Sequence, residues 1–258
     1  MGGVPIVPSA FFAHGSPMIA IEDSDYTRFL GEWGRRCRPG AVLVFTAHWE
    51  RNVTTITCTD DVYGMIYDFG GFPDELYRVV YPARGSTRVA KRAEELLRSA
   101  DIPVRLDESR GLDHGTWTLL CRIFPEADIP VVQASVNPFL PPADQYRIGQ
   151  ALRELGRENV LVIGSGATVH NLSALRWGQR EPERWAVEFD EWLIGKITGG
   201  DLETLFQYET LAPHARLAVP RPEHFVPLFL ALGSGNGEPK VLFRQYDYGT
   251  LSYLSFEF

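Results

Sequence analysis

The chain has 258 residues, of which 45% are hydrophobic, 22% charged and 12% aromatic. These values are close to those of an average globular protein, so they exclude a disordered, collagen-like or coiled-coil chain. The net charge of −8 comes from 25 basic and 33 acidic residues. We therefore expect no nucleic-acid or anionic-membrane partner, because phosphate groups bind to basic surfaces.

Short apolar, β-branched runs alternate with amphipathic stretches along the chain. The runs predict strands at Val4–Val7, Ala41–Thr46, Val53–Cys58, Ile102–Leu106, Ile129–Ala134, Val160–Ile163, Val241–Tyr246 and Leu251–Phe256. Apolar residues at helical spacing predict helices at Asp25–Cys37, Ser86–Ala100, Thr116–Ile123, Ala143–Leu155, Glu183–Thr198 and Pro222–Leu232.

The order of these elements predicts an α/β fold. The run A-V-L-V-F-T-A at residues 41–47 is almost continuously apolar, as expected for a strand with helices covering both faces of its sheet. We expect a sandwich with a central, mostly parallel but mixed sheet, flanked by helices on both faces, with the last two strands added antiparallel. Because no change in composition marks a boundary, residues 1–258 are expected to form a single catalytic domain.

The cysteines and the apolar segments bear on the cellular compartment. Cys37, Cys58 and Cys121 are far apart, and none belongs to a C-x-x-C pair, so we expect reduced thiols rather than a disulfide framework or a thiolate zinc site. No segment approaches the ~20 apolar residues of a membrane span. The first residues also lack the basic and apolar regions of a signal peptide. These features predict a cytoplasmic protein and leave open whether it forms a homo-oligomer.

Histidines stand out by their position. His14, His48 and His170 each follow a predicted strand, and the carboxyl ends of parallel strands open onto one crevice, where α/β proteins bind ligands. His224, in the first turn of a predicted helix, and His114, in a turn flanked by glycine, fit the rim of the same crevice. His214 has no strand before it and is expected to be an ordinary loop residue.

Convergent imidazoles without thiolates suit Zn(II) or Fe(II). Two chemistries then remain open: hydrolysis by a metal-bound water, or the joint binding of a substrate and dioxygen at the metal. Other motifs are weak, since the chain contains no H-E-x-x-H, no P-loop and no G-x-S-x-G elbow.

Five parts of the chain carry a resemblance to a known family. They are A-H-G-S-P-M (Ala13–Met18), A-H-W-E (Ala47–Glu50), Y-D-F-G-G-F-P-D-E-L-Y (Tyr67–Tyr77), L-D-H-G-T-W (Leu112–Trp117), and G-S-G-A-T-V-H-N-L with P-E-H-F-V-P-L near the end. In this order the chain resembles the DOPA-type extradiol dioxygenases, a branch of the class III extradiol ring-cleavage enzymes. The segments span residues 13 to 228.

The resemblance implies a site and an activity. It implies one divalent metal ion on His14, His48 and His224, with His170 as a base or an occasional fourth ligand and His114 as a second acid/base group. The metal would be Fe(II) for turnover or Zn(II) as bound, and O2 would be the co-substrate. The substrate would be a small aromatic diol, DOPA-like or caffeate-like, beneath a loop at residues 67–77.

One feature departs from the wider class, in which two histidines and one carboxylate usually bind the iron. A three-histidine set is also what catalytic zinc uses, so a zinc-dependent hydrolase in the same pocket stays an alternative. Glu223 and Glu50 are the carboxylates expected to support the ligands from behind. Arg78, Arg221 and Arg244 are candidates for pairing with a substrate carboxylate.

Overall fold

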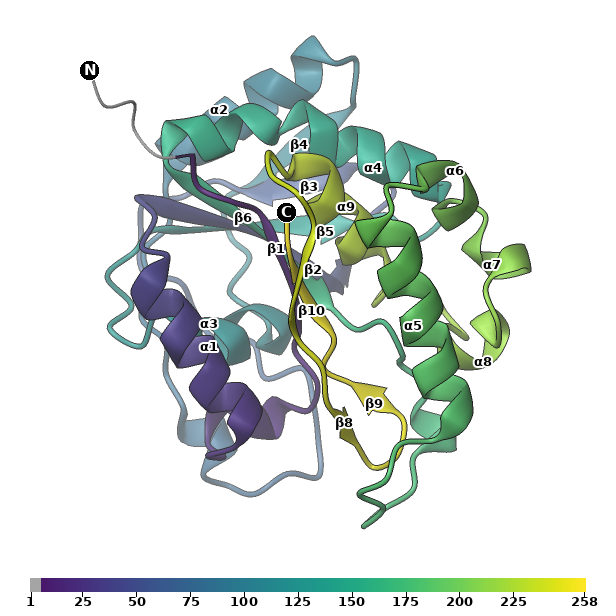
Figure 1. The fold of residues 1–258 in the computed structure, drawn as a ribbon. Coiled ribbons are helices and arrows are strands. Elements are labelled where there is room, and N and C mark those ends of the chain that lie inside the picture. Colours follow the sequence, from purple (N-terminus) through teal and green to yellow (C-terminus); the bar gives the residue numbers. More distant parts are fainter. Residues whose placement is uncertain (1–5) are drawn as a thin grey trace.

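The computed structural model describes residues 6–258, and its central feature is a mixed sheet (Figure 1). Within that range, eight strands follow one another across the sheet in the order β4-β3-β5-β2-β6-β1-β10-β7. Their bounds are β1 Ala10–Ala13, β2 Ala41–Glu50, β3 Thr54–Thr57, β4 Val104–Asp107, β5 Val131–Val136, β6 Val160–Gly166, β7 Lys240–Phe243 and β10 Ser255–Glu257. A separate antiparallel pair is formed by β8 (Tyr246–Asp247) and β9 (Leu251–Ser252).

The predicted α/β architecture is confirmed. Strands β5, β2, β6 and β1 are parallel to one another, and they form the centre of the sheet. β10 pairs antiparallel with both β1 and β7, as expected for the end of the chain. β3 is antiparallel to β5 but parallel to β4, which makes the sheet mixed.

Helices lie on both sides of this sheet. The longer ones are α1 (Asp25–Arg36), α2 (Thr87–Ser99), α3 (His114–Ile123), α4 (Pro142–Ala151), α5 (Arg184–Thr198) and α9 (Val226–Ser234). Three single-turn helices, α6 (Leu202–Leu205), α7 (Tyr208–Leu211) and α8 (Ala215–Ala218), were not predicted. Four residues are too few to show a helical period, so the sequence pattern carried no signal for them.

Alternation along β2 explains why its sequence is apolar throughout. Val42 and Val44 belong to the core cluster under α1 and α3, whereas Leu43 and Phe45 belong to the cluster under α2, α4 and α9. Successive side chains of a strand point to opposite faces, so a strand covered on both sides must be apolar at every position. A third cluster packs α5 and the short helices against the C-terminal strand and α9.

Several predicted boundaries differ from those in the structure. The strand expected at Val4–Val7 lies partly outside the described residues, and the first described strand is β1, at Ala10–Ala13. The helix expected to begin at Pro222 begins at Val226, with Pro227 in its first turn. Because proline has no N–H to donate and fits the first turn of a helix, both prolines are acceptable starts, and the structure uses the second.

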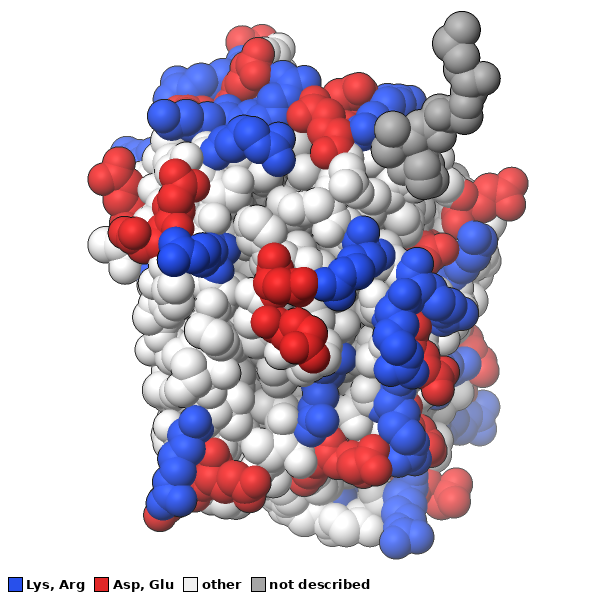
Figure 2. All heavy atoms as spheres, turned by 90° about the vertical axis from the view of Figure 1, so that its left-hand side faces the viewer, with Lys and Arg blue, Asp and Glu red and all other residues white. Residues whose placement is uncertain are grey.

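The surface carries charges of both signs. Figure 2 shows acidic and basic side chains interspersed, with uncharged areas between them, on the side of the molecule that faces left in Figure 1. At the start of α1, Arg28 pairs with Asp23 and Asp25. Among the helices of residues 6–258, none is both long and apolar enough to cross a lipid bilayer. The three cysteines are free thiols.

Candidate metal centre

The carboxyl ends of three neighbouring parallel strands converge on one cavity. His14 directly follows β1, His48 lies near the end of β2, and His170 lies four residues beyond β6. The register places Ala13 beside Gly166, and Thr46 beside Ser165, so His14 and His48 follow at nearly the same level of the sheet. The cavity beyond them has a volume of about 550 Å³ and is lined by five histidines: His14, His48, His114, His170 and His224.

The imidazoles of His14, His48 and His224 lie close to one another; ligand nitrogens of His14 and His48 also lie within 4.8 Å of one of His114, as ligand atoms of His170, Glu223 and His224 do among themselves. The ring centroids of His14 and His48 are 4.8 Å apart, and each lies 5.0 Å from the ring centroid of His224. The Nε2 atoms of His14 and His48 approach to 3.0 Å. Two nitrogens bound to one zinc ion at about 2.0–2.1 Å and the tetrahedral angle are ~3.3 Å apart, so the observed approach is close to that of a shared ion.

Hydrogen bonding identifies which nitrogen of His14 carries the proton. The Ser165 hydroxyl donates its single proton to the carbonyl oxygen of Gly115. It therefore accepts at its 2.9 Å contact with His14 Nδ1, which makes this nitrogen the donor. The Nε2 atom of a neutral His14 then has a free lone pair on the side that faces His48 Nε2.

Each of the other two rings faces a carboxylate. His224 Nδ1 lies 3.1 Å from Glu223 Oε1, and His48 Nδ1 lies 3.4 Å from Asp68 Oδ2. The Glu223 contact is a hydrogen bond that the carboxylate accepts, so His224 carries its proton on Nδ1. Asp68 faces His48 Nδ1 at ion-pair distance. Histidines that bind metals commonly donate their second N–H to such an oxygen, which fixes the ring orientation and strengthens the ligand.

The free nitrogens fit a cation. His224 Nε2 is buried and has no hydrogen-bond partner among the described residues, which is costly for a polar atom unless a ligand binds it. With the proton of each ring on Nδ1, the Nε2 lone pairs of His14 and His48 would repel at 3.0 Å, and a cation bound by both removes that repulsion. Burial and the neighbouring imidazoles keep the pKa of His14 and His224 well below the ordinary value and lower that of His48 to about 3, so neutral rings are available.

His114 pairs with Asp68. The sequence predicted a place for His114 at the rim of the crevice but did not predict its carboxylate partner. His114 is the first residue of α3 rather than part of a free turn. Asp68 Oδ1 accepts both from its Nδ1 at 2.8 Å and from its backbone N–H at 3.1 Å. Although burial acts to raise the pKa of Asp68, these bonds and the nearby imidazoles bring it down to about 2.

Two carboxylates of the site were not singled out in the sequence. Asp68 contacts both His114 and His48, and the only signal for it was its place inside the segment at residues 67–77. Asp113 is fully buried, accepts from Thr46 Oγ1 at 2.7 Å, and pairs with Arg110 at 2.9 Å. The chain has 33 acidic residues, and its sequence does not show which of them contact the histidines; the tertiary structure does.

His170 lies against His224 rather than opposite it. The two rings are stacked with centroids 3.5 Å apart and planes 11° from parallel. Burial lowers the pKa of His170 below its ordinary value, so the ring is neutral near pH 7 and can accept a proton.

The turn that carries His224 packs directly against the backbone at the end of β6. The backbone N–H of Ala167 donates to the carbonyl oxygen of His224 at 2.8 Å. A Cβ added at Gly166 would lie only 2.0 Å from that same oxygen, so a glycine is required where β6 ends beneath the turn.

Gly166→Ala is therefore expected to displace His224. We expect the variant to bind a divalent metal at least about tenfold more weakly and to lose about 1–3 kcal/mol of unfolding free energy, because the backbone must shift. Gly195→Ala in α5 is the matched control, since its added Cβ meets nothing within 4 Å. Chelator competition and urea unfolding measure both effects, and unchanged metal affinity in Gly166→Ala would contradict this role of the contact.

Most of the other residues that the sequence suggested for the site lie outside the cavity. The expected contact of Glu223 with His224 is confirmed, but Glu50 pairs instead with Arg221 at 2.9 Å. Within residues 6–258 the cavity is lined by no lysine or arginine, so the three expected partners of a substrate carboxylate, Arg78, Arg221 and Arg244, are outside it. His214 is outside it too and pairs with Glu188 at 2.8 Å.

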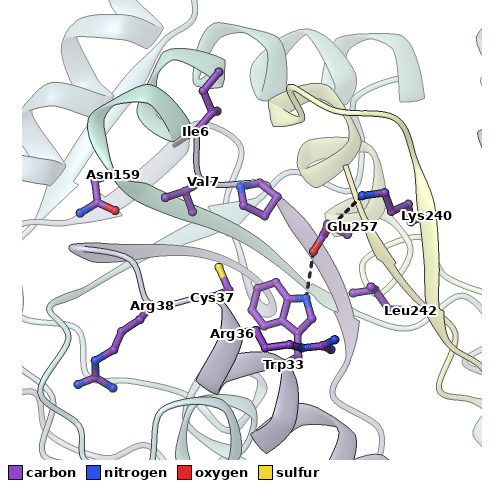
Figure 3. Close-up of a pocket in the computed structure, with 11 residues that line it drawn as sticks. Ile6, Val7, Trp33, Arg36, Cys37, Arg38, Asn159, Lys240, Leu242 and Glu257 are labelled. Carbon is purple, nitrogen blue, oxygen red and sulfur yellow. Dashed lines mark hydrogen bonds and ion pairs between the residues drawn. The ribbon is translucent and has the colours of Figure 1, made fainter. Parts of the chain in front are cut away.

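A second hollow lies at the opposite end of the sheet (Figure 3). It has a volume of about 720 Å³, and Trp33, Lys240 and Glu257 line it together with residues that precede β1 and β6. Glu257 accepts from the Trp33 indole at 3.1 Å and from Lys240 at 3.5 Å. No histidine lines this hollow among the described residues, and it faces the amino ends of the parallel strands, away from the imidazoles.

The fold and the imidazole cluster together define a metal-dependent α/β enzyme with its site at the carboxyl ends of parallel strands. The chain belongs to the family described as the catalytic LigB subunit of aromatic ring-opening dioxygenase, whose model matches residues 8–256. It is thus a ring-opening dioxygenase, and this membership does not favour the alternative zinc hydrolase.

Relatives span the whole chain. It is 41% identical to a 4,5-DOPA dioxygenase extradiol of Beta vulgaris, over 100% of this chain and 99% of that protein. It is 38% identical to a protein of the same name from Escherichia coli (strain K12), over 96% and 93%. A crystal structure of an uncharacterized protein of Escherichia coli K12 superimposes with a TM-score of 0.83 at 34% identity, covering 97% of this chain and 99% of that one.

Proposed function

We propose that the protein cleaves the ring of a catechol beside its two hydroxyl groups, with O2 as co-substrate and Fe(II) held by His14, His48 and His224. The observation that carries this proposal is the convergence of the three imidazoles, together with a buried His224 Nε2 that has no hydrogen-bond partner among the described residues, in a family of ring-opening dioxygenases. Both oxygen atoms enter the ring-opened product, so the reaction consumes no external reductant.

The ion and the side chains have separate tasks. When bound, a divalent ion lowers the pKa of both catechol hydroxyls and brings the diol and O2 together. His170 is neutral and lines the cavity, so it can take a proton from a hydroxyl of the incoming diol. His114 keeps its Nδ1 proton on Asp68, which leaves Nε2 as the nitrogen that exchanges a proton with the reacting substrate.

Asp68 is a positioning residue in this proposal. Asp68→Asn retains an oxygen acceptor but removes the negative charge that faces His114 and His48. We expect kcat to fall about 10–100-fold, with metal affinity reduced as well, as is usual for partners behind metal ligands. Glu223→Gln, which contacts His224 and not His114, should reduce metal affinity with a smaller effect on kcat at saturating Fe(II). Equal kcat losses in the two variants at saturating Fe(II) would contradict a specific role for Asp68.

Anaerobic loading with Fe(II), followed by oxygen-electrode measurements with caffeate or DOPA, tests the function. We expect stoichiometric O2 consumption and a coloured ring-opened product. Ester or amide hydrolysis by the Zn(II)-loaded protein, with no O2 consumption by the Fe(II)-loaded protein, would overturn the proposal in favour of the hydrolase.

We also propose that the enzyme works in the cytoplasm without a nucleic-acid partner. The free thiols of Cys37, Cys58 and Cys121 support a reducing compartment, and the net charge of −8 supports a small-molecule substrate over a polyanion. Size-exclusion chromatography with light scattering tests whether the enzyme is a homo-oligomer.

A further inference from the structure

Asp190 is a buried acidic residue that the proposed reaction does not use. It lies in α5, and none of its surface is exposed to solvent. Its carboxyl group accepts hydrogen bonds from three hydroxyl groups: Thr168 Oγ1 at 2.7 Å, the Tyr246 hydroxyl at 2.8 Å and Ser252 Oγ at 2.5 Å. A buried carboxyl group is costly unless its oxygens are paired, and here Oδ1 accepts one of the bonds and Oδ2 the other two.

Two of these hydroxyls are themselves held by a second donor. Ser252 Oγ accepts from the backbone N–H of Leu254 at 3.1 Å, and the Tyr246 hydroxyl accepts from Arg244 Nε at 3.0 Å. Each hydroxyl then donates its single proton to Asp190. Without the carboxyl group both protons would lose their acceptor, which is costly for a hydroxyl as buried as that of Ser252.

The bond from Thr168 ties the segment that carries His170 to α5. Thr168 is fully buried and lies between the end of β6 at Gly166 and His170. The backbone N–H of His170 donates to the carbonyl oxygen of Ala218 at 3.0 Å. The segment is therefore held at two neighbouring positions, and its side-chain bond lies two residues before the ring that takes a proton from the diol in the proposed reaction.

The other two bonds tie the hairpin of β8 and β9, which lies beside α5 (Figure 1), to the same carboxyl group. Tyr246 begins β8 and Ser252 ends β9. Between them, Tyr248 and Leu251 line the cavity. The Tyr248 ring lies 4.6 Å from that of Trp177, which also lines the cavity and is 77% exposed. The hairpin thus forms part of the cavity wall near its opening.

We propose that Asp190 is a positioning residue that holds the His170 segment and the β8–β9 hairpin in one arrangement around the bound catechol. The inference rests on the proposed dioxygenase function, in which His170 takes a proton from the diol. Loss of the Thr168 bond then disturbs proton transfer. Loss of the hairpin bonds disturbs contact with the part of the substrate beyond the diol.

Thr168→Val tests the first of these effects, because it removes the hydroxyl at nearly constant shape. In the Fe(II)-loaded protein we expect the single-turnover rate of O2 consumption with caffeate to fall at least about fivefold, since a displaced base transfers the proton more slowly. Thr168→Ser retains the hydroxyl and should restore most of the rate.

Ser9→Ala is the control for a lost buried hydrogen bond. The Ser9 hydroxyl donates to the Ala231 carbonyl at 2.7 Å, at the opposite end of β1 from His14. This variant should lose stability and keep the wild-type rate of O2 consumption. A wild-type rate in Thr168→Val, or an equal loss of rate in Ser9→Ala, would overturn the role of Asp190 toward His170.

Tyr246→Phe tests the second effect and leaves the Thr168 bond in place. By calorimetric titration of the Zn(II)-loaded protein, we expect binding of caffeate to weaken at least about threefold and binding of unsubstituted catechol to change less than about twofold. Tyr208→Phe is the control, because the Tyr208 hydroxyl contacts Glu209 at 3.4 Å and lies outside the cavity. Unchanged binding of caffeate in Tyr246→Phe, or equal losses for both ligands, would overturn the role toward the hairpin.

Hydrogen exchange provides a readout that needs neither metal nor turnover. Asp190→Asn retains only one oxygen acceptor, so we expect faster amide exchange at residues 167–171 and 246–252, with unchanged exchange in β2. Should this variant not fold, Thr168→Val and Tyr246→Phe decide the question, because each should speed exchange in its own segment. Unchanged exchange in both segments would refute the inference.

The outcomes for the two proposals are distinguishable. If the wild-type protein consumes no O2 with any catechol, the dioxygenase function is wrong and the catalytic task of His170 falls with it. Hydrogen exchange then still decides whether Asp190 holds the two segments together. If the wild-type protein consumes O2 and the variants behave like it, the function stands and the role of Asp190 is wrong.

Discussion

His14→Ala and His48→Ala are each expected to lose the metal and, with it, all ring-opening activity. Each change removes one of the three imidazoles proposed to bind the metal, and the ring of His14 is 4.8 Å from that of His48. Metal affinity should fall by more than about 100-fold, beyond the 10–100-fold usual for loss of a partner behind the ligand. Elemental analysis after desalting, with O2 uptake on the same samples, measures both effects.

The matched control is His214→Ala. This histidine pairs with Glu188 on the surface and lies outside the cavity, so metal content and turnover should stay at wild-type levels. Circular dichroism should show folded protein in all three variants, because the rings of His14 and His48 face a cavity rather than the packed core. Full metal occupancy in either His14→Ala or His48→Ala would refute the ligand assignment.

His114→Ala should separate metal binding from catalysis. The ring of His114 is held by Asp68 and lies 3.9 Å, centroid to centroid, from that of His48. We propose that its task is proton transfer, so the variant should keep its metal while kcat falls about 10²–10⁴-fold. Single-turnover O2 consumption by Fe(II)-loaded protein provides the measurement, with metal content determined in parallel.

Combining this change with Asp68→Asn tests whether the two residues act together. If Asp68 influences the reaction through His114, Asp68→Asn should lower kcat little further when His114 is already alanine. Independent, multiplicative losses would show that Asp68 acts by another route, such as its 3.4 Å contact with His48. A wild-type rate in His114→Ala would remove His114 from the mechanism.

Much of the fold was predictable because its signals are local. β2 is apolar throughout because both of its faces are buried. α2 has apolar residues at helical spacing because only one of its faces is buried. Ser86 was recognisable as a helix start, and its hydroxyl accepts from the backbone N–H of Val89. The single-turn helices and the start of α9 were not predictable, since packing against α5 and the sheet decides them.

The sequence by itself determined the α/β class, the strand ends that carry His14, His48 and His170, and the resemblance to ring-cleaving dioxygenases. Only the tertiary structure decided that Ser165, Asp68 and Glu223 face the imidazole Nδ1 atoms, because these contacts join residues whose spacing in the chain has no pattern. It also decided the absence of any lysine or arginine in the lining of the described cavity. Whether an arginine faces a pocket depends on how several segments pack together, which no local pattern records.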